Sequence, residues 1–233
     1  GDRLLAGLIE RAPFALLPAG AFLGGLATTL LLYRIATREG RTSIATMLLA
    51  GIAISALAGS IMGFLASVSD DRQLRDLTFW TLGSLGGATW SKVGVTVLLI
   101  LPMLLAAPFL ARGLNALTLG EAEAFHLGVP VQRLKLAAVL LVAVAVGASV
   151  AVSGMIGFVG IVVPHVLRLA FGPDHRLLLP ASALLGAALL IGADTLARTV
   201  IAPAELPIGI ITAALGAPFF LTLLLRDKGK VLA

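Results

Sequence analysis

The sequence predicts an all-α protein that crosses a membrane several times as a polytopic transmembrane helical bundle. Hydrophobic residues make up 59% of its 233 residues and charged residues only 12%, with a mean hydropathy of +1.05. An ordinary soluble domain has about 25% charged residues, so this composition excludes that class. The apolar residues also gather in runs close to the ~20 residues that a helix needs to cross a bilayer.

Seven apolar segments follow one another along the chain, and we expect them to form one transmembrane domain over residues 1–233. The fourth and fifth segments are divided only at Ser153 and Gly154, so they form either two crossings or one crossing and a re-entrant piece. The third and fifth are short for a full crossing. The segments run 13–33, 44–68, 93–111, 134–152, 153–171, 177–195 and 207–225.

The connections between these segments differ in positive charge. One set of helix ends carries eleven of the 17 Lys and Arg residues and the opposite set carries six. Because Lys and Arg are enriched in cytosolic loops, the richer set and the C-terminus are expected in the cytosol. The basic residues are scattered and lack interleaved aromatic residues, so nucleic acid is not an expected partner.

Small residues recur at helical spacing in two of the segments. Gly20 and Gly24 form one GxxxG pattern, and Gly59 and Gly63 form another. In lipid, such residues let helix backbones approach closely. We expect these glycines to pack within the bundle, with a dimer seam as the alternative.

The sequence offers little chemistry of its own. It has no cysteine, and its three histidines have no acidic residues at ligand spacing, so no metal site is expected. It also lacks the GxxxxGK[ST] loop that holds ATP phosphates. Ser153 and His165 on neighbouring segments raise one enzymatic alternative, an intramembrane serine protease. An ion-coupled secondary transporter is another, with Asp194 as its only candidate carboxylate within the membrane.

Three polar positions within apolar segments admit structural explanations. Asp194 and Arg198 are four residues apart, so they can pair on one helix face, either as a neutralised helix end or as a docking site. Arg168 can extend to the membrane interface. Pro164 would disrupt an unsupported helix, so we expect its segment to be short and buried in protein, with His165 as a hydrogen-bonding packing residue and not a proton relay.

Two connections are expected to have structure of their own. Residues 121–127 can form a short helix that Gly128 ends and Pro130 follows, suited to contact with a cytosolic protein or to the membrane interface. Residues 79–90, FWTLGSLGGATW, have tryptophans suited to the membrane surface around a glycine-rich middle. This second stretch is either a short re-entrant helix or an anchored loop.

Motifs along nearly the whole chain, from about Leu16 onward, resemble the FecCD family. They are SGMIGFVGIVVPHVLRLAFGPDHRLLLPASALLGAALLIGADTLAR with PAELPIGIITAALGAPFFLTLLLR, together with GEAEAFHLGV and FWTLGSL. FecCD proteins are the permease subunits of type II ABC importers for iron-siderophores, haem and cobalamin. The family fold has ten helices, and the resemblance implies that this chain holds the last seven. The family's N-terminal block, with its Asn-Pro-Leu-Ala-like signature, has no counterpart here.

The resemblance also implies partners and functional residues. The permease would be a homodimer in the bacterial inner membrane, powered by cytosolic ABC ATPase subunits and supplied by a periplasmic substrate-binding protein. Arg198 would dock that protein, and Thr42, Ser43 and Thr46 would lie where family members narrow the pore, although Thr42 or Ser43 can equally be a helix cap. Region 120–133 would couple the permease to its ATPase. The coupling residues are Glu121, Ala122, Ala124, Phe125, Leu127, Gly128 and Val129.

The function expected from this resemblance is non-catalytic transport with ATP hydrolysis in a partner. No cofactor is expected to be held by the chain. AFHLGV and AVSGMIGFVGIVVPH resemble haem permeases more than siderophore permeases, so haem is the favoured cargo. Ferric siderophore and cobalamin are the alternative cargoes under the same mechanism.

Overall fold

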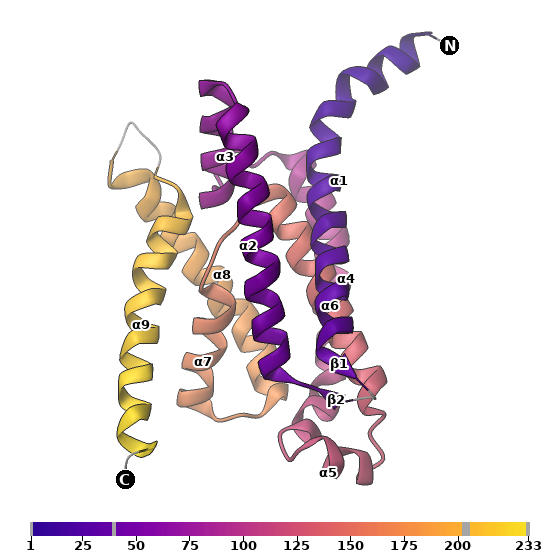
Figure 1. The fold of residues 1–233 in the computed structure, drawn as a ribbon, viewed down its shortest axis with the longest axis vertical. Coiled ribbons are helices and arrows are strands. Elements are labelled where there is room, and N and C mark those ends of the chain that lie inside the picture. The colour runs from indigo at the N-terminus through magenta and orange to yellow at the C-terminus, as the bar shows by residue number, and fades with distance from the viewer. Residues whose placement is uncertain (1, 39–40, 202–205, 232–233) are drawn as a thin grey trace. The chain divides into compact units, whose positions relative to one another are not determined.

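Helices make up nearly all of the protein in the computed structural model, which describes residues 2–38, 41–201 and 206–231 (Figure 1). Two short antiparallel strands, β1 (Thr37–Arg38) and β2 (Arg41–Thr42), join the first two helices. The predicted all-α fold is therefore confirmed. The helices in order are α1 (Asp2–Ala36), α2 (Ile44–Val68), α3 (Asp71–Leu82), α4 (Trp90–Leu117), α5 (Glu121–His126), α6 (Val131–Ser153), α7 (Val159–Phe171), α8 (His175–Thr199) and α9 (Ile208–Val231).

In the described residues, five helices are long and apolar enough to cross a membrane. The predicted break at Ser153 and Gly154 is present, and α7 after it has only 13 residues. Such a helix is about 20 Å long, whereas the hydrocarbon core is about 30 Å thick, so α7 by itself is too short to cross it. The spans are Ala19–Ala36, Ala45–Val68, Trp90–Leu117, Val131–Ser153 and His175–Thr199, and the shorter apolar helices are Val159–Phe171 and Ile208–Leu223.

The third predicted segment, 93–111, proves longer than the sequence indicated. It belongs to α4, which has 28 residues and passes Arg112 before ending at Leu117. Arg112 ended the apolar run in the sequence without ending the helix, because a long polar side chain at a helix end can extend into solvent. The prediction that this segment is short for a crossing was wrong.

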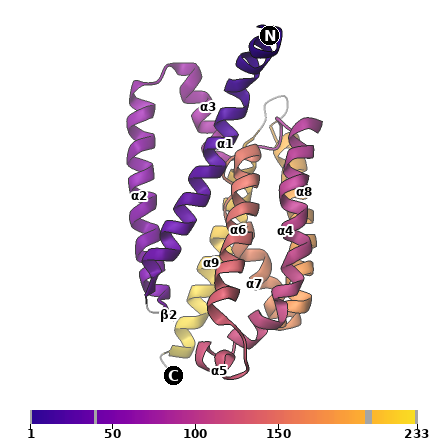
Figure 2. The ribbon, with the colours of Figure 1, turned by 90° about the vertical axis from the view of Figure 1, so that its right-hand side faces the viewer.

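Contacts divide the chain into two units, which are described separately. In unit 1, α1 and α2 contact each other and come together at the end where β1 pairs with β2 (Figure 2). A Cβ atom on Gly147 of α6 would lie 3.1 Å from Cδ2 of Phe22 in α1, so these helices cross closely because Gly147 has no side chain. Unit 1 comprises Gly1–Thr78, Thr89–Ala106 and Pro130–Val152, and unit 2 comprises Phe79–Ala88, Ala107–Val129 and Ser153–Ala233.

The GxxxG glycines do not make the predicted close contacts. A Cβ atom added at Gly20, Gly24, Gly59 or Gly63 would have no neighbouring atom within 4 Å. The expected packing within the bundle was therefore wrong for the described part of the chain. The spacing alone could not show which glycine face meets another helix, and the close approach between α1 and α6 uses different glycines.

Unit 2 is built on the helices α7, α8 and α9, which pack against one another. Its core consists of Val163 and Leu167 from α7 and Leu178 from α8. Pro164 lies inside α7 without ending it. The opposite face of α7 is exposed in this chain, as Leu169 illustrates, so the predicted burial of this segment in protein holds for one face only.

Backbone hydrogen bonds join three loops at the other end of unit 2. The N–H of Met155 donates to the carbonyl of Trp80 (3.1 Å), and the N–H of Ile208 donates to the carbonyl of Gly83 (3.1 Å). Gly83 and Gly154 both have φ +71°, a conformation that favours glycine. Residues 83–89 link α3 to α4 without a helix of their own, which favours the loop interpretation of FWTLGSLGGATW.

Candidate coupling, gate and docking sites

The predicted coupling segment forms a helix at one end of unit 2. Helix α5 begins after Gly120 and ends at His126, one residue before the predicted end. The N–H of Gly128 donates to the carbonyl of Phe125 (2.9 Å), and Gly128 has φ +79°. Figure 1 places α5 at the end of unit 2 where α7 finishes and α8 starts. Gly128 therefore ends the helix as its sequence position indicated.

The side chains of α5 divide into an anchoring face and a free face. Ala124 is fully buried, whereas Phe125 and Leu127 are 71% and 64% exposed. Of the predicted coupling residues, Ala122 and Gly128 are also exposed, while Glu121 and Val129 are half-buried. Ala124 can thus anchor the helix but cannot meet a partner, and the exposed apolar side chains form the surface available for contact.

Asn115 fixes the end of α4 to the start of α8. Its Oδ1 accepts the backbone N–H of His175 at 2.8 Å, and its Nδ2 donates to the Asp174 carboxylate. Asp174 caps α8, accepting the N–H of Arg176 at 3.0 Å. The backbone bond from Arg176, followed by the bond from Asn115, holds the pKa of Asp174 below its ordinary value. No sequence pattern marks Asn115, because its partners lie about sixty residues away.

The three gate candidates lie around the start of α2, and one of them, Ser43, caps this helix. Ser43 Oγ accepts the backbone N–H of Thr46 at 3.2 Å and the Thr46 hydroxyl at 3.0 Å. Thr42 instead contacts Thr37 (3.1 Å) and accepts a hydrogen bond from Lys135 Nζ (2.8 Å). The capping interpretation of Ser43 is therefore confirmed. Lys135 of α6 thereby ties this helix to the start of α2, a contact that no sequence pattern marks.

Arg198 and Asp194 pair as their spacing predicted. Nε of Arg198 lies 2.8 Å from Oδ2 of Asp194 in the last turns of α8. The Arg198 side chain is 47% exposed and that of Asp194 is 24% exposed. The carboxylate therefore orients a guanidinium that still reaches solvent. A docking role for Arg198 stays a prediction.

A serine protease would need a hydrogen bond between Ser153 and His165, and Nε2 of His165 does not make one. His165 Nε2 is buried with no hydrogen-bond partner among the described residues. The ring packs edge to face on Phe219, with centroids 5.9 Å apart, whereas the Ser153 hydroxyl donates to the Gly154 carbonyl at 3.3 Å. His165 thus packs against an aromatic ring as expected, but the hydrogen bond expected of it is not made by Nε2 within the described residues. In the described ranges, no three His, Asp or Glu side chains are placed to share a metal ion.

Three comparisons with known proteins agree on the family. A model of the FecCD transport family matches residues 4–226. The hemin transport system permease protein HmuU of Yersinia pestis is 50% identical over 236 residues, covering 98% of this chain and 70% of the relative. The cobalamin import system permease protein BtuC of Halobacterium salinarum is 44% identical over 208 residues, covering 89% of this chain and 55% of that relative.

A solved structure shows the same fold. It is described as an inward-facing conformation of a metal-chelate type ABC transporter, and it matches with a TM-score of 0.76 and 33% sequence identity. The match covers 88% of this chain and 64% of the solved chain. The residues 4–226 that match the family model include α5, the Asn115 link and the Asp194–Arg198 pair. The chain therefore belongs to the FecCD transport family, as a membrane-spanning permease of the ABC importer type.

Proposed function

We propose that this chain forms the membrane path of an ATP-driven importer that carries haem into the cytosol. The observation that carries this proposal is the pairing of a membrane-spanning helical bundle with α5, a short helix whose exposed apolar side chains lie at one end of it. The relative described as a hemin permease is 50% identical over 98% of the chain. Cobalamin permeases at 44% identity support cobalamin as the second candidate cargo.

In this proposal, α5 transmits the movement of the ATPase to the permease. ATP-driven closure of a partner ATPase would push on the exposed side chains of Phe125 and Leu127, while buried Ala124 passes the displacement to unit 2. Two discrete arrangements of the helices, biased by nucleotide, then open the path to one side or the other. We place the path between two copies of the chain, because one small bundle has no room for a chelate the size of haem.

Selection of the cargo takes place at the opposite membrane surface, where the binding protein docks. The half-exposed guanidinium of Arg198, oriented by Asp194, is suited to an acidic side chain on a periplasmic binding protein. Because His175 begins α8 and Arg198 lies in its last turn, α5 and Arg198 serve opposite membrane surfaces. The binding protein would then select the cargo, and the permease would move what is delivered.

The test reconstitutes the full-length permease with its ATPase in liposomes and delivers haem, cobalamin or a ferric siderophore on the matching binding protein. We expect ATP-dependent uptake of haem, and a Phe125→Ala variant should lose uptake while Phe171→Ala, an equally exposed phenylalanine on α7, retains it. Uptake of cobalamin or siderophore in place of haem would contradict the cargo. Uptake driven by an ion gradient without ATPase would contradict the mechanism.

A further inference from the structure

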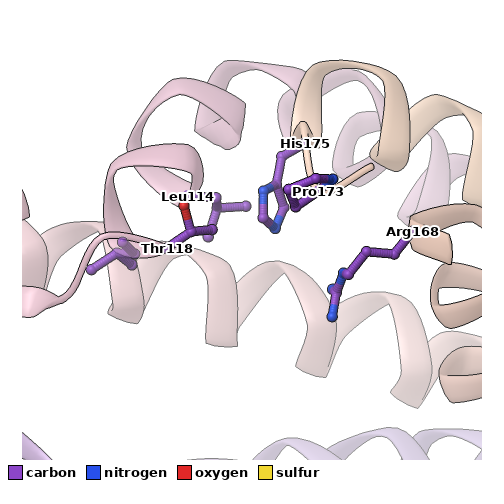
Figure 3. A pocket seen from close by; sticks show the side chains of 6 residues that line it. Leu114, Thr118, Arg168, Pro173 and His175 are labelled. Carbon is purple, nitrogen blue, oxygen red and sulfur yellow. The ribbon is translucent and has the colours of Figure 1, made fainter. Parts of the chain in front are cut away.

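An open cavity of about 420 Å³ lies in unit 2 where α4 and α7 end and α8 begins. Arg168 and His175 extend into the same space from the end of α7 and the start of α8 (Figure 3). The rest of its lining comes from α4, from the turn after it and from the α7–α8 turn. The lining residues are Leu114, Leu117, Thr118, Arg168, Pro173 and His175.

The hydrogen bonds of Asn115 fix the orientation of the His175 ring in this cavity. Nδ1 of His175 lies 2.8 Å from Asn115 Oδ1, the same oxygen that accepts the His175 backbone N–H. An amide oxygen can only accept, so Nδ1 carries the proton. Nε2 is then the nitrogen that can take up a second proton and donate to an anion.

The cavity offers positive charge to a ligand. Arg168 is exposed and makes no salt bridge within the part of the chain that the structure describes. The one carboxylate beside His175, that of Asp174, is occupied by the Arg176 N–H and by Asn115. A guanidinium recognises a phosphate group through charge-assisted hydrogen bonds, and a bound phosphate would favour the protonated form of the neighbouring imidazole.

The cavity also offers apolar surface at a membrane boundary. Leu114 and Leu117 lie one turn apart at the end of α4, and α4 and α8 are both candidate spans. Leu169, the next residue after Arg168 in α7, is 69% exposed in this chain. A free phosphate has no use for these apolar walls, whereas the glycerol and acyl chains of a phospholipid do.

We propose that this cavity binds the headgroup of an anionic phospholipid, with the phosphate on Arg168 and His175 and the glycerol backbone against Leu114 and Leu117. The choice of the cytosolic leaflet, which is rich in anionic lipid, rests on the orientation given under the proposed function. Binding of the lipid itself depends only on the cavity. The bound lipid holds the end of α7 against the end of α4, next to α5.

The experiment measures lipid binding to the delipidated full-length permease by native mass spectrometry. Phosphatidylglycerol and phosphatidylcholine are added separately at equal concentration. We expect the wild type to prefer phosphatidylglycerol and Arg168→Gln to lose that preference by about tenfold, as removal of a charged hydrogen-bond donor predicts. Arg168→Lys keeps the charge but lacks the paired N–H donors of the guanidinium, so it should retain an intermediate preference for phosphatidylglycerol.

Arg176→Gln is the matched control, because it removes a positive charge three residues after Pro173 from a side chain outside the lining. Equal losses in Arg168→Gln and Arg176→Gln would show general charge attraction and overturn the site. Inorganic phosphate at the lipid's concentration should not compete, and full competition would overturn the lipid as ligand.

A further arm separates the lipid from the motor. If Arg168→Gln keeps its lipid preference and instead weakens association with the ATPase, the cavity belongs to a protein interface and the lipid site is wrong. Failure of haem uptake in liposomes would leave these lipid measurements unchanged, so the two proposals can fail independently.

Discussion

Asn115 connects two helix ends that are about sixty residues apart in sequence. One amide accepts the His175 N–H and donates to the Asp174 carboxylate, so it satisfies groups that the start of α8 would otherwise leave to solvent. No local pattern marks such a residue. Asp174 itself is a recognisable helix cap, but the partner that orients it becomes visible only in the fold.

Replacing Asn115 with Ala should loosen the contact between α4 and α8. The lost hydrogen bond from the His175 N–H is worth about 1 kcal/mol, and we expect a lower Tm for the full-length permease in detergent. Thr118→Val is the control, because the one hydrogen bond of the Thr118 hydroxyl among the described residues stays within its own turn, to the Asn115 carbonyl. Equal Tm values for Asn115→Ala and the wild type would contradict a structural role for this link.

Asp174 gives the same link a pH dependence. The Arg176 N–H and Asn115 lower the pKa of Asp174 in the folded state, so its charge stabilises the fold above the ordinary value of about 3.9. This contribution is lost as the pH falls through the lowered pKa. We expect the Tm difference between wild type and Asp174→Asn to be present at neutral pH and to shrink in strong acid. A difference that grows on acidification would contradict this assignment.

At the scale of elements, residue spacing in the sequence predicted the features that depend on contacts within a single helix. The Asp194–Arg198 pair follows from four-residue helical spacing, and the end of α5 follows from Gly128. The prediction that the GxxxG glycines pack within the bundle failed, because this spacing shows that one helix face is smooth but does not show which helix, if any, packs against it. The link between Lys135 and Thr42, ninety-three residues apart, is equally absent from any sequence pattern.

Backbone contact at the start of α9 requires glycine. A Cβ atom on Gly209 would collide with the Leu82 carbonyl, whereas one on Gly192 of α8 would meet nothing within 4 Å. We expect Gly209→Ala to lower the Tm, because the α3–α4 loop must shift. Gly192→Ala should leave the Tm unchanged or raise it, since alanine favours a helix by up to ~1 kcal/mol. The opposite order of Tm values would contradict this packing.

The hydrogen bond from Lys135 to Thr42 should couple α6 to the turn before α2. A double-mutant cycle with Lys135→Met and Thr42→Val isolates the pair from any other interaction of either residue. We expect a coupling energy of about 0.5–1.5 kcal/mol in unfolding experiments. Additive effects of the two substitutions would show that the contact contributes nothing.

For the molecule as a whole, composition predicted the fold class, and the distribution of Lys and Arg predicted which ends of the helices face the cytosol. Membership of a membrane permease family agrees with apolar runs that form helices and with candidate sites that lie in the short connections between them. What composition could not give is which apolar run crosses fully. That depends on where helices end, and α4 continues past a charged residue while α7 stops at 13 residues.

The predicted orientation can be checked directly because the chain has no cysteine. A cysteine at His126 should react with a membrane-impermeant maleimide only from the cytosolic side, and one at Gln73 only from the periplasmic side, in oriented vesicles. This pattern follows from the excess of Lys and Arg at the end that carries α5. Labelling of both cysteines from the same side would contradict the topology.

The 13-residue length of α7 has a consequence for how the protein is made. A segment this short, carrying Pro164 and Arg168, is a weak signal for the machinery that releases helices sideways into lipid one at a time. Its apolar core is completed by Leu178 of α8. We therefore expect α7 to enter the bilayer together with α8, as a helical hairpin, and not ahead of it.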